Sequence, residues 1–192
     1  MNLRGLIERI RHSALVRALG DTRGAAAIEM GLIAPAMLSV MFGTTELASG
    51  VAIDRKVTIT SRSLSDLVAQ STTVSDTDMT NIFNAASSIL TPYPTTPLKA
   101  KVSAVNIDAS LNATVAWSSA LNTTARSVGS AVTIPTGLKL ANSQLIWAEV
   151  SYDYVPAVSK FITGTLTMSD QFFARPRQSS TICRPPTVTT CS

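Results

Sequence analysis

The stretch Arg23-Gly24-Ala25-Ala26-Ala27-Ile28-Glu29 lies where a basic segment gives way to an apolar run, and it decides how the rest of the chain is interpreted. From Ala25 to Thr45 the chain has 21 residues, and Glu29 is the only charged residue among them. A helix needs about 20 predominantly apolar residues to cross a bilayer. The stretch therefore predicts a transmembrane helix over residues 25–48 that carries one carboxylate near its start.

That carboxylate is expensive in lipid, because insertion scales assign an acidic side chain in the centre of a helix a cost of about 2.5–3.5 kcal/mol. A chain that retains Glu29 there is expected to supply a partner for it. The alternative is a plain signal anchor, in which the Glu29 side chain reaches the polar interface.

Small residues recur at every fourth position of the same helix, and they allow another membrane helix to approach closely. They are Ala27, Gly31, Pro35, Ser39 and Gly43. Because Pro35 has no amide donor, the carbonyl of Gly31 loses its helical partner, and a kink or an unwound turn is expected there.

The distribution of charge predicts the topology. Residues 1–24 contain five arginines and two acidic residues, whereas the whole chain has 16 basic and 12 acidic residues. The positive-inside rule places the amino terminus in the cytoplasm and the region after Ala48 outside the inner membrane. The remainder of the chain is almost neutral, which argues against a nucleic-acid partner.

The position of the Gly24–Ala25 junction distinguishes two ways in which the amino-terminal segment could be cleaved. An ordinary secretory signal is cut after its apolar region, whereas this junction comes before the apolar region. A conventional cut near Ala48-Ser49-Gly50 stays open as an alternative, although it requires an unusually long basic region.

The chain after the membrane segment is predicted to be an α+β domain over residues 49–192. Residues 51–70 continue the first helix, and Ser75-Asp76-Thr77-Asp78 caps a second helix, since oxygen side chains accept from the first amides. Strands are predicted at Lys99–Ile107, Leu111–Trp117, Gln144–Val155 and Thr165–Arg177, with an exposed loop over Ser118–Gly137. Short strands without crossover helices imply an antiparallel sheet.

The chain has two cysteines, Cys183 and Cys191, close to its carboxyl end. Two cysteines in an exported domain are expected to form a disulfide; a free reactive thiol is the alternative. No metal site and no cofactor is predicted, because the one histidine, His12, lies before the membrane segment.

The opening motif, residues 23–35, resembles that of the TadE/TadG-like minor pilins (pseudopilins) of the bacterial tight-adherence pilus apparatus. Further similarity lies at residues 55–69, 90–92, 115–118, 145–154 and 175–177, so the resemblance covers most of the chain. Met30 is a departure, because family members often have an aromatic residue after the glutamate.

The resemblance implies a pilin-like fold and a subunit that joins or primes an adhesive pilus. It implies that a prepilin peptidase removes the leader, residues 1–24, by cutting between Gly24 and Ala25. Glu29 is then expected to pair with the free amine of Ala25 on an adjacent subunit in the inner membrane. The expected partners are other pilin or pseudopilin subunits, the pilus assembly platform and the peptidase.

Two other function classes are compatible with an exported domain. A signal-anchored periplasmic enzyme is disfavoured, since the exported part has no histidine, no Gly-x-Ser-x-Gly motif and no metal-ligand cluster. Asp108 and Glu149 are two acids in the predicted sheet region, but single acids on strands usually face solvent. A binding module that uses the loop at 118–137 is compatible with a pilin-like subunit.

Overall fold

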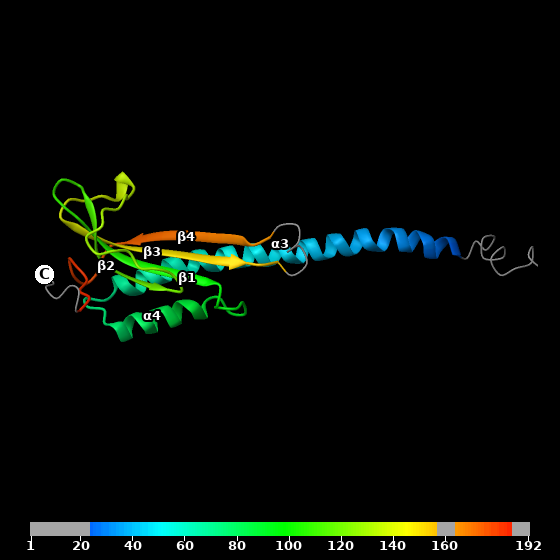
Figure 1. Cartoon of the computed structure of the whole chain (residues 1–192), viewed down its shortest axis with the longest axis horizontal. Helices are drawn as coiled ribbons and strands as arrows, with labels where there is room; N and C mark the ends of the chain where they lie inside the picture. Colours follow the sequence, from blue (N-terminus) through cyan, green and yellow to red (C-terminus); the bar gives the residue numbers. More distant parts are fainter. Residues whose placement is uncertain (1–23, 157–163, 186–192) are drawn as a thin grey trace, which may run out of the picture. The chain divides into compact units, whose positions relative to one another are not determined.

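The computed structural model describes residues 24–156 and 164–185, and it confirms an α+β fold with a long first helix, a second helix and a four-stranded antiparallel sheet (Figure 1). The chain divides into two compact units, Met1–Thr45 and Glu46–Ser192. The elements are α3 (Ala25–Ala69), α4 (Asp76–Ser88), β1 (Leu98–Ile107), β2 (Ala113–Leu121), η2 (Thr136–Leu138), β3 (Ser143–Tyr154) and β4 (Leu166–Ala174).

Helix α3 joins the two predicted helical segments into one helix of 45 residues. The β-branched residues at positions 57–60 do not interrupt it, because Val57 and Thr60 are fully buried and packing outweighs their weak helix propensity. Buried hydroxyls on this helix are satisfied by its own carbonyls: Thr60 Oγ1 donates to Lys56 O at 2.7 Å and Ser65 Oγ to Arg62 O at 2.9 Å.

Helix α4 begins with the predicted cap. Ser75 Oγ accepts from the amide of Asp78 at 3.1 Å, and the Asp78 carboxylate accepts from the amide of Ser75 at 2.9 Å. This reciprocal pair is a capping box. At the other end, Lys56 Nζ donates to the carbonyls of Ile89 and Thr91 at 2.8 Å each, which ties the end of α4 to α3.

The sheet has the order β2-β1-β3-β4, and each neighbouring pair is antiparallel. Three predicted strand boundaries are wrong by two residues or more, and one of them is the end of β4, at Ala174 rather than Arg177. Leu111 belongs to a turn with a positive φ of 65° rather than to β2, and β2 continues beyond Trp117 to Leu121. Residues 118–121 are strand because they pair with residues 100–103 of β1, a contact that local polarity does not reveal.

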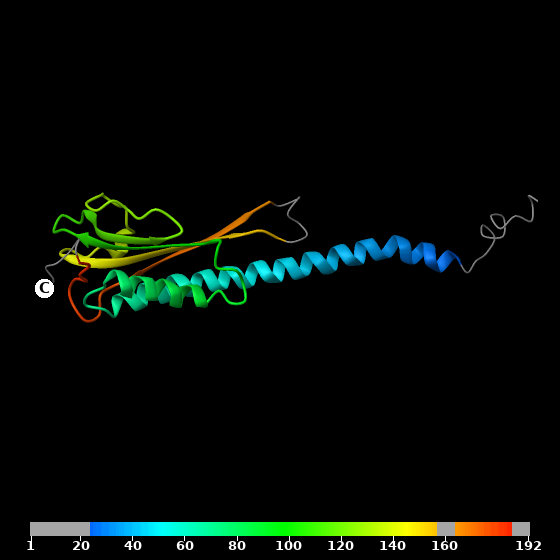
Figure 2. The same ribbon diagram turned by 60° about the horizontal axis from the view of Figure 1, so that its bottom comes forward.

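The two faces of the sheet are covered differently. One face packs on the helices, as Figure 2 shows, and its side chains belong to the main core with Ile53, Leu64 and Phe83. The opposite face carries a smaller apolar cluster, in which Leu145 and Trp147 of β3 pack with Ile134 of the long loop. Side chains of β3 therefore alternate between two apolar clusters, one on each face of the sheet.

Candidate functional site

The first candidate site is the amino-terminal part of α3, whose apolar side chains point outward on every side. This part of the helix passes the length and hydropathy test for a membrane span, with a mean hydropathy of 1.8 and none of its most apolar window buried. The side chain of Ile28 is 76% exposed and that of Leu32 is 81% exposed. A helix that is apolar all round requires an apolar environment, so this segment is compatible with a membrane anchor or a signal sequence.

Glu29 lies one turn into this helix, which begins at Ala25, and its side chain is exposed. The ion pairs found within residues 24–156 and 164–185 do not include it. An unpaired carboxylate in an otherwise apolar helix is costly in lipid. The geometry thus leaves Glu29 accessible to a positive charge from outside this part of the chain.

The junction of Gly24 and Ala25 coincides with the start of the helix. A Cβ added at Gly24 would meet no atom within 4 Å among the described residues. The leader itself, residues 1–23, lies outside the described residues.

The small-residue stripe is open. Neither Gly31 nor Gly43 has an atom within 4 Å of an added Cβ among the described residues, so close approach of a second helix is sterically possible at both. The helix is continuous through Pro35, so the unwound turn expected there is absent. The carbonyl of Pro35 accepts from Ser39 Oγ at 2.7 Å. This bond does not involve the amide that proline lacks.

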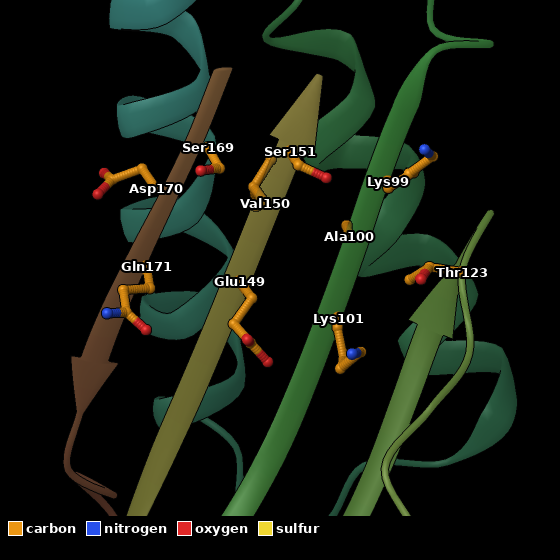
Figure 3. Close-up of a pocket in the computed structure, with 10 residues that line it drawn as sticks. All are labelled: Lys99, Ala100, Lys101, Thr123, Glu149, Val150, Ser151, Ser169, Asp170 and Gln171. Atoms are coloured by element: carbon orange, nitrogen blue, oxygen red, sulfur yellow. The ribbon is translucent and has the colours of Figure 1, made fainter. Parts of the chain in front are cut away.

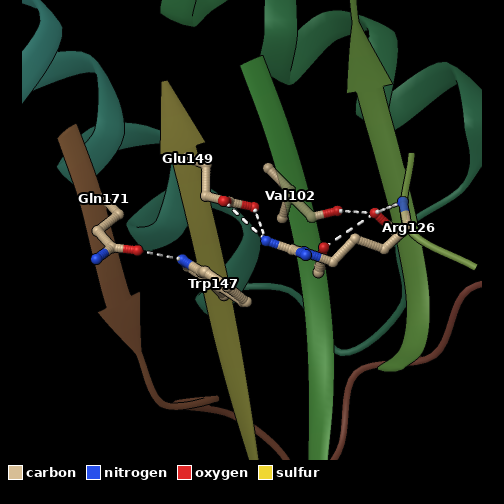
Figure 4. A network of polar contacts seen from close by, with 7 residues as sticks. Val102, Arg126, Trp147, Glu149 and Gln171 are labelled. Carbon is tan, nitrogen blue, oxygen red and sulfur yellow. Dashed lines mark hydrogen bonds and ion pairs between the residues drawn. The ribbon is translucent and has the colours of Figure 1, made fainter. Parts of the chain in front are cut away.

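The second candidate region is the face of the sheet opposite the helices, where the long loop brings Arg126 over β3 (Figure 4). Arg126 Nη2 donates to both carboxylate oxygens of Glu149 at 2.8 Å, and the guanidinium lies 4.0 Å from the centre of the Trp147 ring. Trp147 Nε1 in turn donates to Gln171 Oε1 at 3.1 Å. Glu149 is thus partly exposed but is not a single acid, because an arginine 23 residues away neutralises it.

No feature of the sequence around Arg126 signals this contact, since the loop is rich in serine and threonine and its path is set by long-range pairing. The amide of Arg126 donates to Ser118 Oγ at 3.1 Å, and Asn122 Nδ2 donates to Leu98 O at 2.8 Å. These two bonds hold the start of the loop against the sheet.

Beside this network is an open groove with a volume of about 540 Å³ (Figure 3). Its lining is mostly polar: Lys99, Ala100, Lys101, Thr123, Glu149, Val150, Ser151, Ser169, Asp170 and Gln171. Lys99 donates to Asp153 at 2.7 Å, and this contact is the main reason that the pKa of the Asp153 carboxyl lies below its usual value.

Asp108 and Glu149 are not brought together. Glu149 of β3 lies opposite Lys101 of β1 in the sheet, whereas Asp108 lies beyond the far end of β1. Asp108 instead closes a turn: its carboxylate accepts from Asn112 Nδ2 at 3.0 Å and from the amide of Asn112 at 2.8 Å, and these bonds lower the pKa of the carboxyl. Within residues 24–156 and 164–185, no group of three or more metal-ligating side chains is assembled.

Cys183 is buried and forms a β-bridge with Thr73, while its amide donates to Thr72 O at 3.0 Å. The neighbouring Ile182 carbonyl accepts from Trp117 Nε1 at 2.9 Å. The segment before the carboxyl end is thus fixed to the domain. Cys191 lies outside the described residues, so the pairing of Cys183 with Cys191 stays a prediction.

Comparisons with protein-family models, with curated proteins and with solved structures find no significant match to this chain.

Proposed function

We propose that this chain is a minor pilin or pilus assembly protein of the TadE/TadG-like type, anchored in the bacterial inner membrane and supporting the biogenesis of an adhesive pilus. The observation that carries the proposal is the exposed, all-round apolar start of α3 with Glu29 as its one charge. The pilin-like architecture, a long apolar helix followed by an antiparallel sheet packed on helices, agrees with it.

The mechanism begins with removal of residues 1–24 by a prepilin peptidase in the same membrane. That cut creates a free amine on Ala25, four residues before Glu29. Four residues of α-helix rise about 6 Å, so the amine and the carboxylate of one subunit lie about one turn apart. A second subunit shifted by one turn along the helix axis would place its Ala25 amine beside Glu29 of the first.

Charge pairing of this kind would select and orient subunits. Two opposite charges attract strongly in a medium of low dielectric constant. Their attraction offsets the free-energy cost of taking each charge out of water. The accessible glycines of the small-residue stripe would let the two helices approach closely enough for the pair to form.

The proposed role is structural and not enzymatic. The exported part of the sequence has no histidine to serve as a base for its many serine and threonine hydroxyls. The two acids singled out in the sequence are engaged elsewhere, Glu149 by Arg126 and Asp108 in a turn. No cofactor and no nucleic-acid partner are included in the proposal.

Replacement Glu29→Gln tests the proposal. Membrane insertion should be unchanged or improved, because a carboxylate leaves the apolar helix, and processing at Gly24 should largely persist. Pilus assembly should fail, because the incoming amine loses its counter-charge.

The matched control is Glu29→Asp, which keeps the charge on a shorter side chain and should retain part of the assembly. Normal pili from the Glu29→Gln strain, with normal membrane content and processing, would show that Glu29 is a surface carboxylate of a plain anchor.

A further inference from the structure

One end of the sheet is held against α3 near the predicted exit of this helix from the membrane. Tyr154, the last residue of β3, pairs with Leu166, the first residue of β4. A Cβ added at Gly50 would lie 3.5 Å from Met168 Cε and 4.0 Å from Tyr154 Cε1. In Figure 1 the end of β3 overlaps α3, whereas Figure 2 shows that the start of β4 stands away from the helix.

The predicted membrane segment ends at Ala48, only two residues before Gly50. Two residues of helix rise about 3 Å, and the polar interface on each side of a bilayer is about 5–7 Å thick. The contact at Gly50 therefore places the base of the β3–β4 hairpin at the depth of the lipid headgroups.

Exposed aliphatic side chains gather at this end of the domain. Val155 is 46% exposed and Leu166 is 42% exposed on the hairpin, while Leu47 is 70% exposed and Val51 is 48% exposed on α3. We call these four residues the hairpin-base surface. Single exposed aliphatic residues are ordinary, but all four lie within three positions of the contact at Gly50: Leu47 and Val51 lie near Gly50 on α3, and Val155 and Leu166 lie near Tyr154 and Met168 on the hairpin.

Tyr154 lies at the Gly50 position, and the other two tyrosines of the chain lie near it. The Tyr152 hydroxyl donates to Pro94 O at 3.0 Å. The pKa of Tyr154 is raised, first by burial and then by the nearby Glu46 carboxylate and by Tyr93, so the three phenols are neighbours. Tyrosine is enriched at membrane interfaces because its ring is apolar and its hydroxyl is polar.

The opposite end of β3 provides a contrast. Leu140, 51% exposed, lies just before the strand begins at Ser143. A strand of 12 residues spans about 36 Å at about 3.3 Å per residue. An aliphatic residue at that end is therefore far from any bilayer that α3 spans.

We propose that the hairpin-base surface rests in the headgroup layer of the bilayer that α3 spans, so that lipid, rather than another protein, covers it. This proposal rests on the membrane anchoring in the proposed function, and it adds a second membrane contact to the helix. Two contacts would fix the domain's tilt, which a single helix leaves free.

The test places one nitroxide label at a time in the full chain, in a background with Cys183→Ala and Cys191→Ala. The labelled variants are Leu166→Cys at the proposed contact, Val40→Cys within the apolar run and Leu140→Cys at the far end. Each is reconstituted in nanodiscs of phosphatidylethanolamine and phosphatidylglycerol. Collision with dissolved oxygen and with a water-soluble nickel complex then reports the depth of the label.

The expected result is an ordered series. The label at position 40 should collide with oxygen and be shielded from nickel, the label at position 140 should show the reverse, and the label at position 166 should lie between them at headgroup depth. Transfer to detergent micelles should raise nickel collision at position 166 at least several-fold and leave position 140 unchanged.

Two results would overturn the proposal. Equal collision rates at positions 166 and 140 would show that the hairpin-base surface faces water. Low collision with both reagents at position 166, in micelles as in nanodiscs, would show that protein covers it. Failure of the membrane anchor itself is distinguished by the label at position 40, which would then collide freely with nickel.

Discussion

The contact between Arg126 and Glu149 should contribute measurably to the stability of the domain, because it joins the long loop to the sheet. Its two side chains are 25% and 29% exposed, and its N–O distance is 2.8 Å. Hydrogen bonds to charged groups contribute about 1.5–3 kcal/mol when they are shielded from water, and exposed ion pairs contribute about 0.2–1 kcal/mol. Partial exposure places the expected coupling energy between these, at about 1–2 kcal/mol.

A double-mutant cycle measures this coupling. Arg126→Met keeps the aliphatic stem over Trp147 and removes the charge, and Glu149→Gln keeps the shape of the partner. Arg126→Met alone should cost more than the coupling energy, since it also removes the cation–π contact, which contributes about 0.5–2 kcal/mol. Urea unfolding of the full chain in mild detergent, followed by far-ultraviolet circular dichroism, gives the four free energies of unfolding.

The matched control is the pair Lys99 and Asp153 on the same sheet. Its N–O distance is 2.7 Å, but its side chains are 46% and 29% exposed. The cycle Lys99→Met with Asp153→Asn should therefore give a coupling energy of only about 0.2–1 kcal/mol. Coupling energies that are equal for the two pairs, or below about 0.3 kcal/mol for Arg126 and Glu149, would refute the reasoning from burial.

Three further predictions follow from single contacts. Trp117→Phe removes a buried indole donor to a backbone carbonyl and should lower the free energy of unfolding by about 1–3 kcal/mol in urea titration. Cys183 and Cys191 should be joined in protein from the exported compartment, so that alkylation adds mass only after reduction; alkylation of both without reductant would contradict this. Bonds to Ser75 lower the pKa of Asp78 below its ordinary 3.8; the cap's stabilisation is therefore full above that pH and is lost as the pH falls through the lowered pKa. The free energy of unfolding, measured at a series of acid pH values, should show this loss in the original protein and not in Asp78→Asn. The same pH profile in both proteins would contradict the capping role.

Much of the fold could be predicted from local sequence. The apolar run after Gly24 predicts the exposed start of α3, and Ser75 with Asp78 predicts the start of α4, because a helix cap is a contact between residues three apart. The alternation in β3 likewise predicts a strand, since its period follows from strand geometry.

What could not be predicted depends on contacts between distant residues. Ser118 and Ser119 are small and polar, and residues 118–121 are strand only because β1 lies alongside to pair with them. Glu149 is paired only because the loop carries Arg126 back across the sheet. The hairpin-base surface is equally hidden in the sequence, because Gly50 and Tyr154 are 104 positions apart and meet only in the fold.

The central claim, a subunit processed ahead of its membrane helix, is tested most directly by the intact mass and amino-terminal residue of the protein isolated from membranes. Processing at the start of α3 predicts a chain that begins at Ala25 and lacks the mass of residues 1–24. A chain that begins near Val51 would contradict the claim and indicate ordinary secretion, and an uncut chain in the membrane would reduce α3 to a plain anchor.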